Sequence, residues 1–120
     1  KIKNRFAGQV YVLTDPGSFS ATGEMTGIIK GYDRATFIGE EAGGNPVANT
    51  SGAMLPLILP NSQIRTLVPI VQFVMAVDLV NDGHGVRPDH RLRNSIEDEL
   101  AGRDAVMEYT LELIRKNQSK

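Results

Sequence analysis

The stretch QVYVLTDPGSFSATGEMTGIIKGYDRATFIG, residues 9–39, decides the fold. It opens with β-branched and aromatic residues (9–14), which predict a buried strand. A sharp turn follows at residues 15–18, because Asp, Pro and Gly each favour a reversal of the chain. Apolar residues then recur at helical spacing from about Ser20, and the run 34–39 predicts a second strand. Strand, helix and strand in this order predict a parallel β-α-β unit and therefore an α/β fold.

The expected helix carries one apolar stripe. Its members lie at positions i, i+3, i+4 and i+7 and are Met25, Ile28, Ile29 and Tyr32. This spacing is typical of one face of an amphipathic α-helix. The stripe ends near residues 31–33, where the helix is expected to stop.

The middle of the chain alternates loops with apolar segments. A loop rich in Gly, Asn and Pro (39–52) precedes two expected strands within residues 53–77. The strands turn at residues 60–62, and their prolines imply edges or bends. The Met and Val run 71–77 reads most simply as a core strand. A second glycine-punctuated loop follows at residues 81–90.

The C-terminal tail is predicted to be helical. Ser95 with Asp98 resembles a capping box, and Gly102 interrupts the segment after one or two turns. A longer helix is expected over residues 103–117. Its apolar side is expected to pack and consists of Val106, Met107, Leu111, Leu113 and Ile114.

Composition narrows the classes of protein. The chain has 120 residues, 41% of them apolar, which suits one domain with a modest core. The net charge of −1 argues against a nucleic-acid partner. The absence of cysteine excludes disulfides, thiolate catalysis and thiolate metal sites, and leaves the redox compartment open. The longest apolar run, 67–80, contains Gln72 and Asp78 and is shorter than the roughly 18 residues that span a bilayer. The opening KIKNRFAGQVYVL, without an initiator methionine, suggests a piece of a longer protein.

Two serines in the turn are candidates for chemistry. Ser18 and Ser20 lie where a strand gives way to a helix, so a hydroxyl there sits beside the backbone N–H groups of the first helical turn. Such N–H groups can stabilise an oxyanion, and small neighbours allow a substrate to approach. The residues do not form the G-x-S-x-G pattern. The competing interpretation is that either serine caps the helix and Glu24 helps to close the turn.

Four segments, in order, carry a family resemblance: GSFSATGE (17–24), RATFIGEEAGGNP (34–46), NDGHGVRPD (81–89) and SIEDELAGRDAVMEYTLELI (95–114). Together they resemble the C-terminal half of the catalytic domain of the C-terminal processing (tail-specific) peptidases. This serine peptidase family includes the tricorn protease core. The resemblance extends over about residues 8–115. It implies that residues 1–120 are a fragment of that domain, with a partial Clp-protease/crotonase-like ββα spiral.

The resemblance assigns roles to individual residues. Ser20 matches the family nucleophile, which leaves Ser18 as a turn residue. The Ala21 N–H matches the oxyanion donor beside the nucleophile. The loop with Gly43 and Gly44, together with Gly17, is expected to flank the substrate.

The general base is not evident in this stretch. One branch of the family places a lysine in a G-K-G element, but the matching residues here are Gly43, Gly44 and Asn45. The tricorn-like branch uses a histidine from earlier in the chain, oriented by an acidic residue in a downstream loop. Asp82 matches that acidic position, where glutamate is the commoner residue. The resemblance therefore implies a histidine upstream of Lys1.

The other ionisable residues allow several interpretations. His84 and His90, with nearby aspartates, could suggest a metal site, but their spacing suits no helical ligand pair and a glycine-rich loop pre-organises ligands poorly. We expect no metal and no cofactor. His84 is expected to be solvated, with a role as substitute base for Ser20 as the alternative. Glu40 and Glu41 are expected to be a solvated pair that faces opposite ways.

These observations predict a serine endopeptidase that acts on polypeptides, often at their C-terminal ends, and that is exported to the periplasm, the envelope or the exterior. The last two features rest on the resemblance alone. The isolated 120 residues are expected to be inactive without the upstream part of the same protein. One alternative is a non-catalytic peptide-binding or scaffolding member of the fold, and another is a crotonase-type acyl-CoA enzyme. The oligomeric state stays open.

Overall fold

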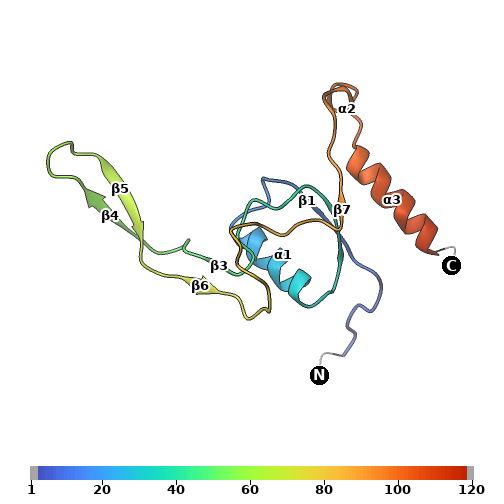
Figure 1. Ribbon diagram of the computed structural model, residues 1–120, viewed down its shortest axis with the longest axis horizontal. Coiled ribbons are helices and arrows are strands. Elements are labelled where there is room, and N and C mark those ends of the chain that lie inside the picture. Colours follow the sequence, from blue (N-terminus) through green and yellow to red (C-terminus); the bar gives the residue numbers. More distant parts are fainter. Residues whose placement is uncertain (1–2, 119–120) are drawn as a thin grey trace.

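The centre of the structure, a computed structural model that describes residues 3–118, is a three-stranded parallel sheet (Figure 1). In sheet order its strands are β1 (Tyr11–Thr14), β2 (Thr36–Gly39) and β7 (His90–Arg91). The helix α1 (Ala21–Gly31) connects β1 to β2, which run parallel. The predicted β-α-β unit and the α/β class are therefore confirmed.

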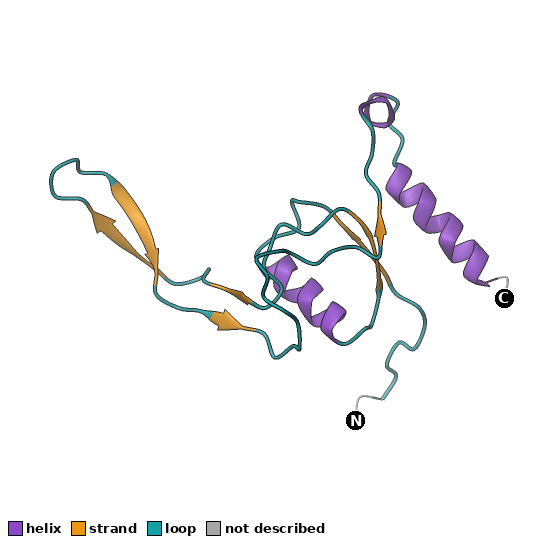
Figure 2. Ribbon diagram, viewed as in Figure 1, coloured by secondary structure: helices purple, strands orange, loops and turns teal. Residues whose placement is uncertain are grey.

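The remaining elements lie on either side of this sheet (Figure 2). They are β3 (Ala48–Asn49), β4 (Met54–Ile58), β5 (Arg65–Pro69), β6 (Phe73–Val74), α2 (Ile96–Leu100) and α3 (Ala105–Gln118). β4 and β5 form an antiparallel hairpin, and β3 pairs with β6 near its base. The hairpin projects away from the sheet, while α3 lies on the opposite side of the molecule.

The hydrophobic core is small. Its fully buried apolar residues are Phe37, Ile38, Ala42 and Val86. Val12, Ile29 and Ala35 pack against this cluster from β1, α1 and the start of β2. The core therefore holds α1 against one face of the sheet and reaches neither the hairpin nor most of α3.

The helix α1 packs through small residues. Gly23, Thr26 and Gly27 are buried, whereas three members of the predicted apolar stripe are exposed. The reason is the close approach of a loop: a Cβ on Gly27 would lie 2.2 Å from the carbonyl oxygen of Pro46. At this spacing only a face without side chains can form the contact.

Two further expectations about burial are wrong. Residues 71–77 do not form a core strand, because only Phe73 and Val74 are in β6, and they are 46% and 68% exposed. In α3, Met107 and Leu111 are exposed as well. The strands and helices form close to where the sequence pattern predicts them, but within residues 3–118 these apolar side chains are left largely uncovered by other parts of the chain.

The turn and cap predictions are confirmed. Ser95 accepts the Asp98 N–H (3.1 Å), and the Asp98 carboxylate accepts the Ser95 N–H (2.9 Å), which completes the capping box of α2. Gly102, with φ of +65°, follows the end of this helix. The hydrogen bonds from the Ser95 N–H and hydroxyl, together with the Arg103 guanidinium, hold the pKa of Asp98 below its usual value.

Asp89 ties three elements together just before β7. Its carboxylate accepts the Phe37 N–H of β2 (2.8 Å) and forms an ion pair with Lys30 of α1. Its own N–H donates to the Phe37 carbonyl (2.8 Å). Partial burial pushes the pKa of Asp89 upward, but the Lys30 ammonium and the Phe37 N–H outweigh it, so the pKa lies below its usual value.

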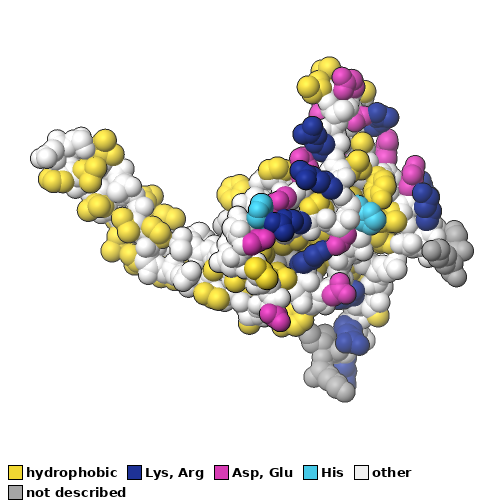
Figure 3. All heavy atoms as spheres, in the orientation of Figure 1, with side chains coloured by type: hydrophobic (Ala, Val, Ile, Leu, Met, Phe, Trp, Pro, Cys, Tyr) yellow, Lys and Arg dark blue, Asp and Glu magenta, His cyan; other side chains and the backbone are white. Residues whose placement is uncertain are grey.

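The molecule is extended. Its principal extents are 66 × 47 × 26 Å, and its radius of gyration is 18.7 Å. A compact chain of this length has a radius of gyration of about 14 Å. Figure 3 shows the hairpin as a protruding arm covered with hydrophobic side chains. Within residues 3–118, no helix is long and apolar enough to cross a membrane.

Replacing Gly27 tests the packing of α1. We expect Gly27→Ala to lower the free energy of unfolding by about 1–3 kcal/mol, because the added methyl meets the Pro46 backbone. In a helix interior free of such contacts the same change stabilises by about 1 kcal/mol. Gly31→Ala, at the last residue of the same helix, is the control, since its Cβ would lie 3.0 Å from the Val77 side chain and not 2.2 Å from a backbone oxygen. Chemical denaturation measures both. Equal stability of the two variants would contradict this packing.

Asp89→Asn tests the tie before β7. The ion pair is partly exposed, so we expect a loss of about 1 kcal/mol at neutral pH. Because the folded pKa of Asp89 is lowered, its contribution is present above the unfolded pKa of about 4 and is lost as the pH falls through the folded value. The variant should therefore lose less stability than the parent on acidification. Asp78→Asn, at an exposed carboxylate, should change neither the stability nor its pH dependence.

Candidate functional site

Ser20 occupies the sharpest point of the turn between β1 and α1. It is the N-cap residue of α1, with φ of +57° and ψ of −125°. A positive φ is uncommon for a residue other than glycine and costs on the order of 1–3 kcal/mol. Such backbone strain persists only where surrounding structure imposes it, and it clusters at active sites.

The Ser20 hydroxyl does not cap the helix. It makes no side-chain capping bond and has no other hydrogen-bond partner in residues 3–118. Glu24, which the capping interpretation required, instead accepts a hydrogen bond from the Asn49 side chain. The interpretation of Ser20 as a simple cap is therefore wrong. Its side chain is exposed.

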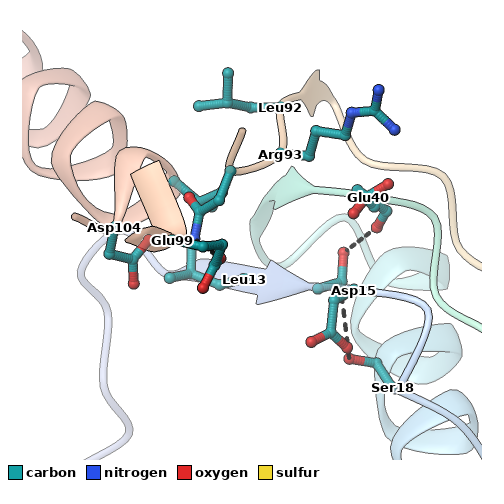
Figure 4. A pocket seen from close by; sticks show the side chains of 11 residues that line it. Leu13, Asp15, Ser18, Glu40, Leu92, Arg93, Glu99 and Asp104 are labelled. Atoms are coloured by element: carbon teal, nitrogen blue, oxygen red, sulfur yellow. Dashed lines mark hydrogen bonds between the residues drawn. The ribbon is translucent and has the colours of Figure 1, made fainter. Parts of the chain in front are cut away.

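Ser18 has the turn role. Its hydroxyl donates to Asp15 Oδ1 (3.0 Å), and its oxygen accepts the Asp15 N–H (3.3 Å). Figure 4 shows the two side chains pointing toward each other. A hydroxyl engaged twice within its own turn is poorly placed to attack a substrate. The two serines of this turn are thus distinguished by their hydrogen bonds.

The first turn of α1 offers a backbone donor beside Ser20. The Thr22 N–H donates to the Phe19 carbonyl (3.2 Å), and the Glu24 N–H donates to the Ser20 carbonyl (3.1 Å). The Ala21 N–H has no acceptor in the described part of the chain. An unpaired N–H at the positive end of a helix dipole, next to an exposed hydroxyl, can stabilise negative charge on a bound oxygen.

The glycine loop packs directly against this turn. A Cβ on Gly43 would lie 2.1 Å from the Pro16 carbonyl oxygen, and one on Gly44 would lie 3.1 Å from the Ser20 nitrogen. The structure thus brings both glycines to the serine turn. Gly17 lies exposed within the turn itself. This loop supports the conformation of Ser20 from behind, through backbone atoms alone.

Asp82 lies in the loop between β6 and β7. Its carboxylate accepts the His84 N–H (3.1 Å) and a hydrogen bond from the Arg87 guanidinium (3.0 Å). The His84 N–H and then the charge of Arg87 hold its pKa below the usual value. Within residues 3–118 no hydrogen bond connects Asp82 to Ser20. The two residues are thus not joined directly by the structure.

A pair that the sequence analysis did not predict joins the two loops. Glu41 Oε1 accepts from His84 Nδ1 (2.9 Å) and from the Gly85 N–H (3.0 Å). These bonds, the one with His84 first, hold the pKa of Glu41 below its usual value. The expectation of a solvated Glu40–Glu41 pair is therefore wrong for Glu41. The partners are 43 residues apart, so no local sequence signal could have revealed them.

The histidines do not gather at one place. His84 is bound to Glu41, whereas His90 Nδ1 lies 2.9 Å from the Tyr109 hydroxyl of α3. Among residues 3–118 no group of three or more His, Cys, Asp and Glu side chains has the geometry of a metal site.

A cleft opens beside the serine turn, at the carboxyl end of β1. It has a volume of about 340 Å³, and Figure 4 shows part of its lining. Asp15 and Ser18 of the turn border it on one side, and Leu92 and Arg93 border it on another. Ser18 is the one serine of the turn among its lining residues, and Ser20 is not part of the lining.

Comparisons with known proteins add to this geometry. The sequence model of Peptidase family S41 matches residues 1–92. The structure is similar to that of a "putative peptidase" from Parabacteroides merdae, with a TM-score of 0.61 and 24% sequence identity. That similarity covers 94% of this chain and 34% of the other, so this chain spans about a third of its length. No curated protein gives a significant match. The family match confirms the resemblance and covers the first three of the four segments, whereas the segment 95–114 lies outside it.

Removal of the Glu41 carboxylate tests whether it holds the two loops together. We expect Glu41→Ala to speed hydrogen exchange at the Gly85 amide, which donates to the Glu41 carboxylate, roughly tenfold, the equivalent of about 1.4 kcal/mol. Glu40→Ala is the matched control, because the Glu40 carboxylate has no partner in the described residues. Exchange followed by mass spectrometry compares them. Equal protection in both variants would show that the Glu41–His84 pair does not hold the loop.

Proposed function

The chain belongs to peptidase family S41, and from this premise we propose that it carries the nucleophile of a serine endopeptidase, Ser20. Its substrate is a polypeptide, and the reaction passes through an acyl-enzyme on the Ser20 oxygen. The proposal concerns the complete enzyme, of which residues 1–120 form the C-terminal part of the catalytic domain.

One observation carries this proposal: the conformation of Ser20 together with the unpaired state of its hydroxyl. A capping serine gains its stability from a bond to the first turn, and Ser20 makes none. A strained backbone that presents a hydroxyl beside an unpaired N–H has a clear use in acyl transfer. If Ser20 had only a structural role, we would expect an unstrained backbone at this position or a hydrogen bond to its hydroxyl.

The mechanism follows from these groups. The Ser20 oxygen attacks the scissile carbonyl while a histidine from upstream of Lys1 takes its proton. The Ala21 N–H donates to the oxyanion that forms. The histidine then gives the proton to the leaving amine, and water releases the acyl group in a second round. We assign to Asp82 the orientation of this histidine, because its carboxylate remains ionised at neutral pH.

Three finer features belong to the same proposal. We assign the chain to the Clp-protease/crotonase-like spiral, because a parallel β-α-β unit with a serine at the strand-to-helix turn suits that fold. The loop with Gly43 and Gly44, together with Gly17, flanks the substrate. Action at C-terminal ends of polypeptides and export from the cytoplasm are assigned by resemblance to the tail-specific peptidases.

A non-catalytic peptide-binding member of the family is the second candidate. It is favoured by the lack of a lysine in Gly43–Asn45 and by the shorter Asp82 at the acidic position. Such a protein would keep the cleft and the turn but would not activate Ser20. The two candidate functions differ in whether the Ser20 hydroxyl oxygen is reactive.

Ser20→Ala in the full-length protein decides between them. We expect loss of peptide hydrolysis by at least about 10³-fold and loss of fluorophosphonate labelling, because only an activated serine reacts readily. Ser18→Ala is the matched control and should retain most activity, since Ser18 only braces the turn. Residues 1–120 alone should neither hydrolyse peptides nor react.

Three outcomes would count against the proposal. Retained hydrolysis in Ser20→Ala would reject Ser20 as the nucleophile. A full-length protein that binds peptide but is inert to fluorophosphonate would favour the non-catalytic candidate. Activity of the isolated 120 residues that requires Ser20 would move the base from the upstream histidine to His84 or His90.

A further inference from the structure

The hairpin of β4 and β5 is apolar on both faces. Residues directly opposite in the two strands share a face, and alternate residues along each strand share a face. The register places Leu55 opposite Val68 on one face, and Pro56 opposite Leu67 on the other, with Ile58 two residues along. The side chains of all four large aliphatic residues in this set are about half exposed: Leu55, Ile58, Leu67 and Val68.

The hairpin carries almost no charge. In residues 53–77 the only ionisable side chain is Arg65. Figure 3 shows hydrophobic side chains along the length of this arm. Strands with a continuous apolar run are typical of sheets covered on both sides, and a lone two-stranded hairpin is marginally stable in water. Both faces of the arm therefore require a cover.

We propose that the upstream part of the same polypeptide covers both faces of this hairpin. The inference rests on the proposed function, which requires an upstream histidine to reach Ser20. The surface identifies the kind of partner: an uncharged, apolar layer of protein on each side of the arm. Pairing at the strand edges is disfavoured by Pro56 and Pro69.

One observation favours this occupant over a second copy of the chain. The similar structure is a longer chain, and about two thirds of it has no counterpart in this one. That additional polypeptide is the natural cover for two opposite apolar faces.

Photo-crosslinking in the full-length protein tests the inference. The probe p-benzoyl-phenylalanine is placed at position 57 for one face and at position 67 for the other. Position 100 of α2, where Leu100 is 85% exposed, is the matched control. We expect monomer-sized adducts at both arm positions, several-fold more abundant than at position 100. Mass spectrometry should locate the crosslinked partner upstream of Lys1.

Each other outcome overturns the inference. Adducts between two copies would identify a dimer arm, and adduct levels equal to those at position 100 would show an uncovered hairpin. The same probes in the Ser20→Ala background separate this test from that of the nucleophile. If the proposed function fails, Ser20→Ala still hydrolyses peptide while the crosslinks persist. If this inference fails, hydrolysis depends on Ser20 while the upstream crosslinks are absent.

Discussion

The candidate site depends on a backbone-to-backbone contact between α1 and the loop that follows β2. Gly23 and Gly27 present a face without side chains, and Pro46 approaches Gly27 more closely than any Cβ would allow, while Gly44 leaves little room for one on Gly23. A Cβ on Gly44 would also lie 3.1 Å from the nitrogen of Ser20. The position of α1, the path of the loop after β2 and the backbone conformation of Ser20 therefore depend on one another. A methyl group on any of these glycines would have to displace backbone rather than side chain.

This contact explains how a small core can support a strained residue. A positive φ at Ser20 costs conformational free energy, and no local hydrogen bond of its side chain offsets this cost. The glycine loop on one side and the Asp15–Ser18 hydrogen bonds on the other fix the ends of the turn. The Glu41–His84 pair then anchors the glycine loop to the loop that contains Asp82. The Ser20 turn and the Asp82 loop, to which the resemblance assigns catalytic roles, are therefore connected through the glycine loop, although no hydrogen bond joins Ser20 to Asp82.

Local patterns predicted the elements but not their burial. The β-α-β unit, the hairpin turn, the capping box and the break at Gly102 follow from short-range rules that need no tertiary partner. The run 71–77 was expected to form a core strand and does not, and of the α1 stripe only Ile29 packs against the core. Apolar periodicity indicates that a surface needs a cover without indicating which segment provides it. The motif singled out Ser20, and its strained backbone and unpaired hydroxyl could not have been predicted from the motif. The Glu41–His84 pair could not have been predicted either, since loop-to-loop contacts at long separation leave no periodic signal.

The exposed arm and the missing base have one physical explanation. The two proposals assign the hydrophobic surface that residues 3–118 leave uncovered, and the proton acceptor that the Ser20 hydroxyl lacks in the same residues, to one further part of the same polypeptide. The geometry of the proposed nucleophile, Ser20, is nevertheless set locally by backbone contacts within the chain. Pre-organisation of the serine and its activation by a base are therefore separable properties of this fold. An enzyme built in this way can hold its nucleophile ready and still depend on the packing of a distant segment to become reactive.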